Sequence, residues 1–266
     1  MKKKIGFIGL GNMATAMIEG ILKKNIAEPS DLAGSARTQE TCDRAKQKYG
    51  INVGTNKEVA SVSDILFLAI KPQFFGIVAD EIRSFVKKDA IIVSIAAGIT
   101  LQNMKDFFQN SNLKFIRCMP NTPALVLAGC TGVCPGEHIA PEELQDILHI
   151  LEAFGTVSIV PENLMDVVVG VSGSSPAYVF LFIEAMADAA VAGGMPRKQA
   201  YEFAAQSVMG SAKMVLETGR HPGELKDMVC SPAGTTIQAV KVLEERGFRG
   251  AVFDAVEACI NKAKKI

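Results

Sequence analysis

The sequence predicts an α/β domain with a mostly parallel sheet of about eight strands, followed by an all-helical domain. Short, continuously apolar runs such as Ile5 to Ile8 recur through the first part of the chain, as in parallel strands buried on both faces. Segments with helical spacing separate these runs. After Pro161 only helical patterns remain. We therefore expect a dinucleotide-binding domain at residues 1–161 and a helical domain at residues 162–266.

The first apolar run leads into a turn with the pattern G-x-G-x-x-A. In a dinucleotide site Gly9 allows a tight turn, Gly11 lets a pyrophosphate approach the backbone, and Ala14 lets the next helix pack closely on the sheet. The phosphates would lie on the free N–H groups at the start of that helix. The order of strand, turn and helix thus favours a Rossmann-type nucleotide site over an unrelated glycine-rich turn. The residues of this turn predicted to bind the cofactor are Gly9, Leu10, Gly11, Asn12, Met13 and Ala14.

The second predicted strand, residues 31–35, is followed by Ser35-Ala-Arg-Thr38 rather than by an acidic residue. An acidic side chain at this place holds the ribose 2′-hydroxyl of NAD, and Asp31 lies at the wrong end of the strand to do so. Arg37, flanked by hydroxyl groups, suits a 2′-phosphate because a guanidinium offers charge-assisted hydrogen bonds. The sequence therefore favours NADP(H) with NAD(H) possible, unless Arg37 is only a surface arginine. We interpret Asn56 as a helix cap near the adenosine.

Further strands are expected at residues 51–53, at 64–72, within 90–98, and at 113–118, 130–134 and 156–160, with a helix over 141–154. Small residues and prolines follow three of these strands, in Ala69-Ile-Lys-Pro72, in Ala96-Ala-Gly98 and in Met119-Pro-Asn-Thr-Pro-Ala124. Ligands of open α/β sheets lie beyond such strand ends, and small residues there leave room for a flat ring. Each of these turns, taken alone, could also be an ordinary connection between a strand and a helix.

The second half of the chain is expected to be helical. Hydroxyl residues and a proline at residues 172–176 predict a capped turn. The helix that follows, 177–193, is apolar nearly all round and predicts a subunit interface, hence at least a dimer. Glu184 and Asp188 on it are interpreted as solvent-side or cleft-side charges rather than metal ligands. A long helix over 196–218 ends at Gly219, a short one follows His221, and a last one reaches Glu245.

That last helix opens with Ser231-Pro-Ala-Gly-Thr-Thr236. The unpaired N–H groups of such a helix start form an anion pocket sized for a carboxylate. Plain N-capping by Ser231 or Thr235 is the alternative. Combined with a nicotinamide site, the turn suggests a small carboxylic acid held for hydride transfer. We find no clear acid pair of the kind that reduces ketones, so a substrate that already carries its proton, such as a cyclic iminium, fits best.

Composition excludes several other classes of function. The 28 lysines and arginines balance the 28 aspartates and glutamates, which gives no sign of a nucleic-acid or anionic-membrane partner. No uninterrupted apolar stretch approaches ~18 residues, and the N-terminus lacks a signal-peptide pattern. The six cysteines are scattered and the three histidines have no metal-binding spacing. We therefore expect a cytoplasmic protein with reduced, mostly buried thiols, no metal and no membrane span.

These stretches together resemble the pyrroline-5-carboxylate reductase family over the whole chain. The motifs that carry the resemblance are Phe7-Ile-Gly-Leu-Gly-Asn-Met-Ala14, Ala69-Ile-Lys-Pro72, Ser94-Ile-Ala-Ala-Gly98, Arg117-Cys-Met-Pro-Asn-Thr-Pro-Ala124, Ser172-Gly-Ser-Ser-Pro-Ala-Tyr178, and His221-Pro222 through Ser231-Pro-Ala-Gly-Thr-Thr236 to Leu243-Glu244. The resemblance implies that NAD(P)H reduces the C=N bond of 1-pyrroline-5-carboxylate to L-proline, in the last step of proline synthesis. It also implies a Rossmann domain and an all-helical domain that dimerises, with a larger ring of dimers possible.

The resemblance also implies residue roles. Thr236 matches the hydroxyl that hydrogen-bonds the ring nitrogen, and Ser231, Gly234 and Thr235 match a carboxylate pocket contributed by the partner subunit. The positions that match cofactor contacts are Ser35, Arg37, Asn56, Ala69, Lys71, Pro72, Ala97, Met119, Pro120 and Asn121. Ser175 and Ala233 depart from the family pattern, because each replaces a common glycine.

Two other functions compete with this one. A β-hydroxyacid dehydrogenase shares the glycine turn and a helical second domain, but would carry a lysine general acid in a helix. Lys213 is the one mid-helix lysine in the long helices there, and it lacks that family's flanking pattern. A non-catalytic NADP-binding sensor would keep the glycine turn, but would have no reason to keep the turn at residues 231–236.

Overall fold

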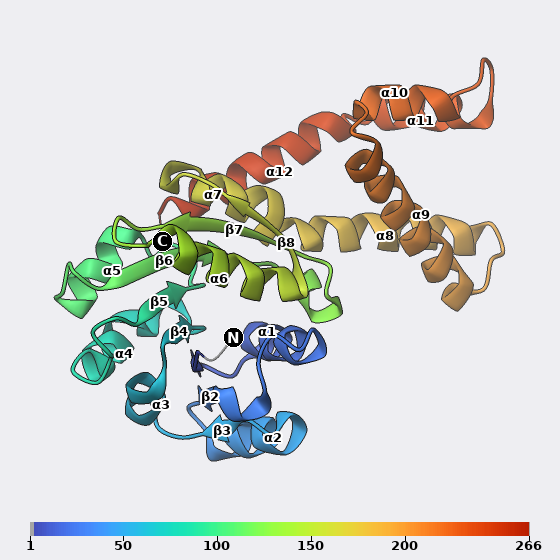
Figure 1. The fold of residues 1–266 in the computed structure, drawn as a ribbon. Helices are drawn as coiled ribbons and strands as arrows, with labels where there is room; N and C mark the ends of the chain where they lie inside the picture. The colour runs from blue at the N-terminus through green and yellow to red at the C-terminus, as the bar shows by residue number, and fades with distance from the viewer. Residues whose placement is uncertain (1–2, 266) are drawn as a thin grey trace. The chain divides into compact units, whose positions relative to one another are not determined.

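A computed structural model describes residues 3–265 and contains an eight-stranded sheet in the order β3-β2-β1-β4-β5-β6-β7-β8 (Figure 1). The strands are β1 Ile5–Ile8, β2 Leu32–Ser35, β3 Asn52–Val53, β4 Ile65–Leu68, β5 Ile91–Ser94, β6 Lys114–Met119, β7 Gly129–Pro135 and β8 Gly155–Ile159. Strands β1 to β6 are parallel, whereas β7 runs antiparallel to β6 and parallel to β8. The predicted mostly parallel sheet of about eight strands is confirmed.

The helices are α1 Asn12–Lys23, α2 Gln39–Tyr49, α3 Asn56–Val62, α4 Phe75–Ile82, α5 Leu101–Phe108, α6 Pro141–Leu151, α7 Met165–Val168, α8 Ser175–Ala192, α9 Arg197–Thr218, α10 Pro222–Val229, α11 Thr235–Glu245 and α12 Phe248–Ala263. The segment that forms α12 was expected to be helical, as part of the helical domain at residues 162–266, but without bounds of its own. The chain divides into two compact units. One runs up to Ser174 and includes the residues from Cys259 on, and the other is Ser175–Ala258.

The sheet is covered by helices on both faces. Phe7 packs in a cluster with side chains of α1, α2 and α6, whereas its neighbour Ile8 packs in a second cluster with α3, α4 and α5. Phe7 also stacks on Phe67 of β4, with ring centroids 5.1 Å apart. Because successive side chains of a strand point to opposite faces, both must be apolar when both faces are covered. This explains why β1 is a continuous apolar run rather than an alternating one.

A buried arginine joins the sheet to the helical segment that follows it. Arg117 of β6 is 4% exposed, and its guanidinium lies 3.3 Å from Asp166 and 3.5 Å from Glu162. These ion pairs bind the start of the helical half to the sheet. Residues 162–174 accordingly belong to the first compact unit. The domain assignment 1–161 and 162–266, with its boundary earlier in the chain, stays a prediction.

Replacing Arg117 by methionine is expected to lower the free energy of unfolding by about 1–3 kcal/mol. The substitution leaves two carboxylates beside apolar surface without their cation, but both are partly exposed and can recover water. The urea midpoint at one fixed protein concentration measures the effect. Lys105→Met is the matched control, because Lys105 pairs with the exposed Glu137 and should cost less than about 1 kcal/mol. Equal shifts for the two variants would contradict the assigned role of Arg117.

The chain stays helical where the sequence predicted a capped turn. A π-helical segment, Val169–Gly173, connects α7 to α8, and Pro176 lies in the first turn of α8. The predicted position of Pro176 in the first turn of a helix is confirmed, whereas Ser172 and Gly173 lie in the π-helical segment rather than in a capped turn. A proline has no N–H to donate to the carbonyl four residues earlier, which here is Ser172. The Nδ2 group of Asn121 donates to that carbonyl instead, at 3.1 Å, so the helix continues without an orphaned acceptor.

The helical run Glu162–Ala192 is long and apolar enough to cross a membrane by length and composition. The sequence analysis expected no membrane span because it considered only uninterrupted apolar stretches. Within α8 the buried residues are Pro176 and Ala187, while Phe180 and Leu181 are 62% and 68% exposed. A helix that is covered by a second subunit has the same composition, because burial in an interface selects apolar residues as a membrane does.

Candidate active site

The glycine turn after β1 has the geometry that a dinucleotide site requires. Gly9 has φ +96°, and a Cβ atom there would lie 2.4 Å from the carbonyl oxygen of Ala69. Its N–H donates to the carbonyl of Ser35 at 2.9 Å, which joins the ends of β1 and β2. A Cβ atom added at Gly11 would have no neighbour within 4 Å. Gly9 is therefore required by the fold, whereas Gly11 leaves its open side free for a ligand.

The start of α1 presents backbone N–H groups that no side chain caps. Gly11 is the N-cap residue, and no side chain caps the helix. The hydroxyl of Thr15 donates to the carbonyls of Gly11 and Asn12, so it does not serve the helix N–H groups. Ala14 is fully buried and lets the helix lie close to the sheet. Free N–H groups at a helix start carry partial positive charge and bind phosphate, so this end of α1 fits a diphosphate.

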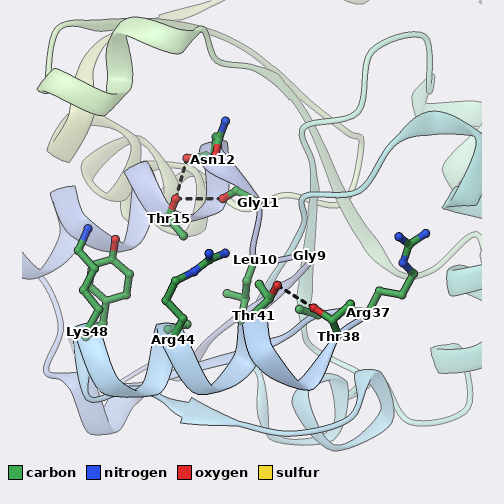
Figure 2. Close-up of a pocket in the computed structure, with 13 residues that line it drawn as sticks. Gly9, Leu10, Gly11, Asn12, Thr15, Arg37, Thr38, Thr41, Arg44 and Lys48 are labelled. Atoms are coloured by element: carbon green, nitrogen blue, oxygen red, sulfur yellow. Dashed lines mark hydrogen bonds between the residues drawn. The ribbon is translucent and has the colours of Figure 1, made fainter.

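A cavity of about 520 Å³ lies between this turn and α2. Its lining residues include three cationic side chains, Arg37, Arg44 and Lys48, and no acidic one. Figure 2 shows Arg44 extending from α2 toward the glycine turn. Arg37 lies at the other end of the cavity, and its guanidinium points away from Arg44 (Figure 2). The cavity thus offers positive charge beside an uncapped helix start, a combination that fits a phosphorylated nucleotide.

The cavity residues that were not predicted from the sequence include four with polar or charged side chains: Thr15, Thr41, Arg44 and Lys48. Thr41, Arg44 and Lys48 are spaced by three and four residues on α2, so they share one face of the helix. This spacing is the one feature of the sequence that could have indicated a role for these three residues. Charged residues at this spacing also occur on any solvent-exposed helix, and only the packing of α2 beside the glycine turn distinguishes the two cases.

Most of the other predicted cofactor residues lie along one edge of the sheet. Ala69 follows β4, Ala97 lies beyond β5, and Met119 ends β6. Lys71 is the N-cap of a 3₁₀ turn that begins at Pro72 and leads into α4. Since β1 to β6 are parallel, their carboxyl ends meet at the edge where ligands of open α/β sheets bind. The contacts of these predicted residues with a nicotinamide stay predictions.

Ser35 and Asn56 are brought together, but they face each other rather than the cavity. Ser35 is 1% exposed, and its hydroxyl donates to Oδ1 of Asn56 at 2.7 Å. The cap of α3 is Thr55, whose hydroxyl accepts from the N–H of Glu58 in a capping box. The interpretation of Asn56 as a cap is therefore wrong, because Thr55 has a glutamate three positions later and completes the box. The roles of Ser35 and Asn56 toward a cofactor stay predictions.

The side chain of Asn121 is occupied by structural hydrogen bonds. Its Oδ1 accepts from the N–H of Cys130 at 2.8 Å, and its Nδ2 donates to Ser172. Asn121 is 8% exposed, and the neighbouring Pro120 is buried. The loop after β6 is thereby held to β7 and to the π-helical segment. If Asn121 contacts a cofactor, its backbone is the part that remains to do so.

The second predicted turn also presents an uncapped helix start. Gly234 is the N-cap of α11 and no side chain caps it, so neither Ser231 nor Thr235 acts as a plain N-cap. A Cβ atom at Gly234 would lie 2.3 Å from the hydroxyl oxygen and 3.1 Å from the carbonyl oxygen of Ser231, so a larger residue there would require the Ser231 side chain to move. Thr235 and Thr236 are the first two residues of α11. Their N–H groups have no partner within the helix, which fits a carboxylate ligand.

Ala233 adopts a left-handed backbone conformation, with φ +58°. This conformation costs a residue with a Cβ atom roughly 1–2 kcal/mol, whereas glycine adopts it freely. The alanine at this position, noted above as a departure from the family pattern, therefore keeps the backbone of a glycine turn at an energetic cost.

Two of the buried cysteines, Cys118 and Cys134, are unsuited to nucleophilic chemistry. All six are free thiols, and Cys42, Cys118 and Cys134 are buried. Burial raises the pKa of Cys118 far above its ordinary value and also raises the pKa of Cys134. Both thiols are consequently neutral at physiological pH, and a neutral thiol is a poor nucleophile.

Known proteins match the chain over its whole length. A family model described as "Pyrroline-5-carboxylate reductase dimerisation" matches residues 162–266, and one described as "NADP oxidoreductase coenzyme F420-dependent" matches residues 4–98. The pyrroline-5-carboxylate reductase of Escherichia coli is 53% identical over 267 residues, covering 100% of this chain and 99% of that protein. The chain belongs to the pyrroline-5-carboxylate reductase family.

Solved structures of this family have the same fold. A pyrroline-5-carboxylate reductase from Coxiella burnetii gives a TM-score of 0.91 at 33% identity, covering 100% of this chain and 98% of that one. A pyrroline carboxylate reductase from Plasmodium falciparum, solved with NADP bound, gives 0.91 at 31% identity with the same coverage. The family resemblance that the sequence motifs indicated is confirmed.

Proposed function

We propose that this chain, as a homodimer in the cytoplasm, reduces 1-pyrroline-5-carboxylate to L-proline with NADPH as the preferred cofactor. The observation that carries the proposal is the uncapped, sterically restricted turn from Ser231 to Thr236, which suits a small carboxylate. It occurs in a chain that is 53% identical over its full length to a pyrroline-5-carboxylate reductase. In the reaction the carbon of the protonated C=N bond, an iminium, gains a hydride, which gives the secondary amine of L-proline.

The first unit binds and orients the cofactor, which supplies the hydride when bound. The N–H groups at the start of α1 hold the diphosphate, and Gly11 leaves room for it. Arg37, beyond the end of β2, binds the 2′-phosphate that distinguishes NADPH from NADH. The remaining turns at the sheet edge contact the nicotinamide through Ala69, Lys71, Pro72, Ala97, Met119, Pro120 and Asn121.

The turn at the start of α11 binds the substrate. Ser231, Gly234 and Thr235 hold the carboxylate, and the hydroxyl of Thr236 hydrogen-bonds the ring nitrogen. The partner subunit contributes this turn to the site, so the homodimer is the functional unit, and a larger ring can be built from such dimers. The protein then acts by positioning and electrostatics, because an iminium substrate already carries its proton.

The structure gives no support to the hydroxyacid dehydrogenase alternative. Lys213, the one mid-helix lysine that could act as its general acid, lies on α9 with its side chain 68% exposed. Its ammonium group lies 3.5 Å from Glu217 at the spacing of a surface ion pair. A general acid is expected to be partly desolvated, so that its pKa is lowered toward the working pH.

Absorbance at 340 nm with purified protein, NADPH and 1-pyrroline-5-carboxylate tests the proposal. Oxidation of NADPH that depends on the pyrroline supports it, and L-proline should accumulate in equal amount. Binding of NADPH without oxidation would instead indicate a sensor. Oxidation of hydroxyacids, with no activity on the pyrroline, would indicate the dehydrogenase.

Replacing Arg37 by alanine is expected to weaken NADPH binding about tenfold and NADH binding less than about twofold. The reason is that NADPH alone carries the phosphate that the guanidinium binds. Fluorescence titration of the free protein with each cofactor measures the two dissociation constants, and NADH serves as the internal control. Equal losses would remove the argument for NADPH preference from this residue.

A further inference from the structure

Arg44 is a cation of the cofactor cavity that no predicted role uses. We propose that Arg44 is a second specificity-determining residue for NADPH, binding the 2′-phosphate together with Arg37. The inference rests on the proposed function, because it concerns the cofactor of that reaction. Arg37 was assigned to the 2′-phosphate because it lies beyond the end of β2. Arg44 instead reaches the cavity from the second turn of α2.

The guanidinium of Arg44 is available for a ligand. Across residues 3–265 it forms neither an ion pair nor a hydrogen bond, although it lines a cavity (Figure 2). Lys48, one turn further along the same face, is different. Its ammonium group lies 3.6 Å from Glu19 and 4.8 Å from the ring centroid of Tyr49, and its hydrogen bond with Tyr49 raises the pKa of Lys48. Of the two α2 cations that line the cavity, Arg44 is therefore the one that is free to bind an anion.

The position of Arg44 favours the 2′-phosphate over the diphosphate. The N–H groups of α1 already provide donors for the diphosphate. Thr38 and Thr41, whose hydroxyl groups lie 2.8 Å apart, are placed between Arg37 and Arg44 in Figure 2. A phosphate monoester carries about −1.5 to −2 charges at neutral pH, so one guanidinium does not neutralise it. In the structure the Arg37 guanidinium points away from Arg44 (Figure 2), so its exposed side chain has to change rotamer for both groups to reach a phosphate beside the two hydroxyls. The two guanidinium groups then match the charge and the acceptor oxygens of the phosphate.

Isothermal titration calorimetry of Arg44→Gln tests this inference without relying on turnover. The ligands are NADPH and NADH, followed by 2′,5′-ADP and 5′-AMP, which isolate the phosphate from the nicotinamide. We expect about tenfold weaker binding of NADPH and 2′,5′-ADP, and less than about twofold change for NADH and 5′-AMP. Lys46→Gln is the matched control, because Lys46 is an exposed residue of α2 outside the cavity and the change in net charge is the same.

The possible outcomes separate this inference from the proposed function. Equal losses of affinity for the ligands with a 2′-phosphate and for those without it would overturn the inference, since Arg44 would then act on the diphosphate or 5′-phosphate or through general charge. No loss beyond that of Lys46→Gln would also overturn it. A wild-type protein that binds NADPH but does not reduce 1-pyrroline-5-carboxylate would refute the proposed function alone. Selective loss for the two 2′-phosphorylated ligands would still support the role of Arg44.

Discussion

Replacing Thr236 by alanine is expected to lower kcat roughly 100-fold, with less than a twofold change in the dissociation constant of NADPH. Thr236 is the second residue of α11, and across residues 3–265 its hydroxyl has no hydrogen-bond partner. A hydroxyl that is free in the unliganded protein can be used fully by the substrate. Because the Thr236 hydroxyl is assigned as a hydrogen-bond partner of the ring nitrogen, removing this hydroxyl should slow the step in which the charge on that nitrogen changes.

Steady-state kinetics with varied pyrroline and saturating NADPH, together with direct NADPH titration, separate the two effects. Thr236→Ser is the matched control, because it keeps the hydroxyl and should retain most of kcat. A large fall in NADPH affinity for Thr236→Ala would place the residue in the cofactor site and contradict the assignment. Unchanged kcat for both variants would remove Thr236 from the reaction.

Replacing Leu181 by glutamate is expected to separate the subunits and reduce activity more than about 100-fold at micromolar protein. Leu181 is 68% exposed on α8 and lines an apolar groove of about 1210 Å³ formed with α11 and α12. The family model for dimerisation covers all three helices. An unpaired charge buried in an interface costs about 3–5 kcal/mol, and a symmetric dimer buries two copies.

Analytical ultracentrifugation and activity assays at the same series of protein concentrations provide the measurement. Ile77→Glu is the control, because Ile77 is 70% exposed on α4 of the other unit and receives the same change of side chain. Circular dichroism verifies that both variants remain folded. A Leu181→Glu monomer with full activity would show that one chain contains the whole site, and would refute the proposal that the partner supplies the substrate turn.

Much of the fold could be predicted because local and global requirements agree in it. The run at Ile5 to Ile8 is apolar because both faces of β1 are covered, and Gly9 follows because the turn passes within contact distance of Ala69. Gly219 ends α9 in the left-handed conformation that glycine favours. In each case the residue type that the sequence displays is the one that its position demands.

The errors arose where a distant residue supplied what the local sequence lacked. The segment at residues 172–176 contains a proline and hydroxyl residues and predicted a capped turn. The helix continues there because Asn121, from the loop after β6, satisfies the carbonyl that Pro176 leaves free. Asn56 was misassigned for a different reason, because Thr55 and Glu58 form a capping box that could have been recognised from the sequence.

The sequence by itself determined most of the order of elements, the two glycine-containing turns before helices, and the family. These features depend on residue types at short spacing, where glycine, proline and apolar runs have strong local preferences. The tertiary structure showed that neither helix start has a side-chain cap. Only the tertiary structure decided which charged side chains share a cavity. Arg44 and an ordinary surface arginine are identical in sequence terms, and they differ because α2 packs beside the glycine turn. Electrostatic roles depend on distances between segments, and those distances are set by packing rather than by local sequence.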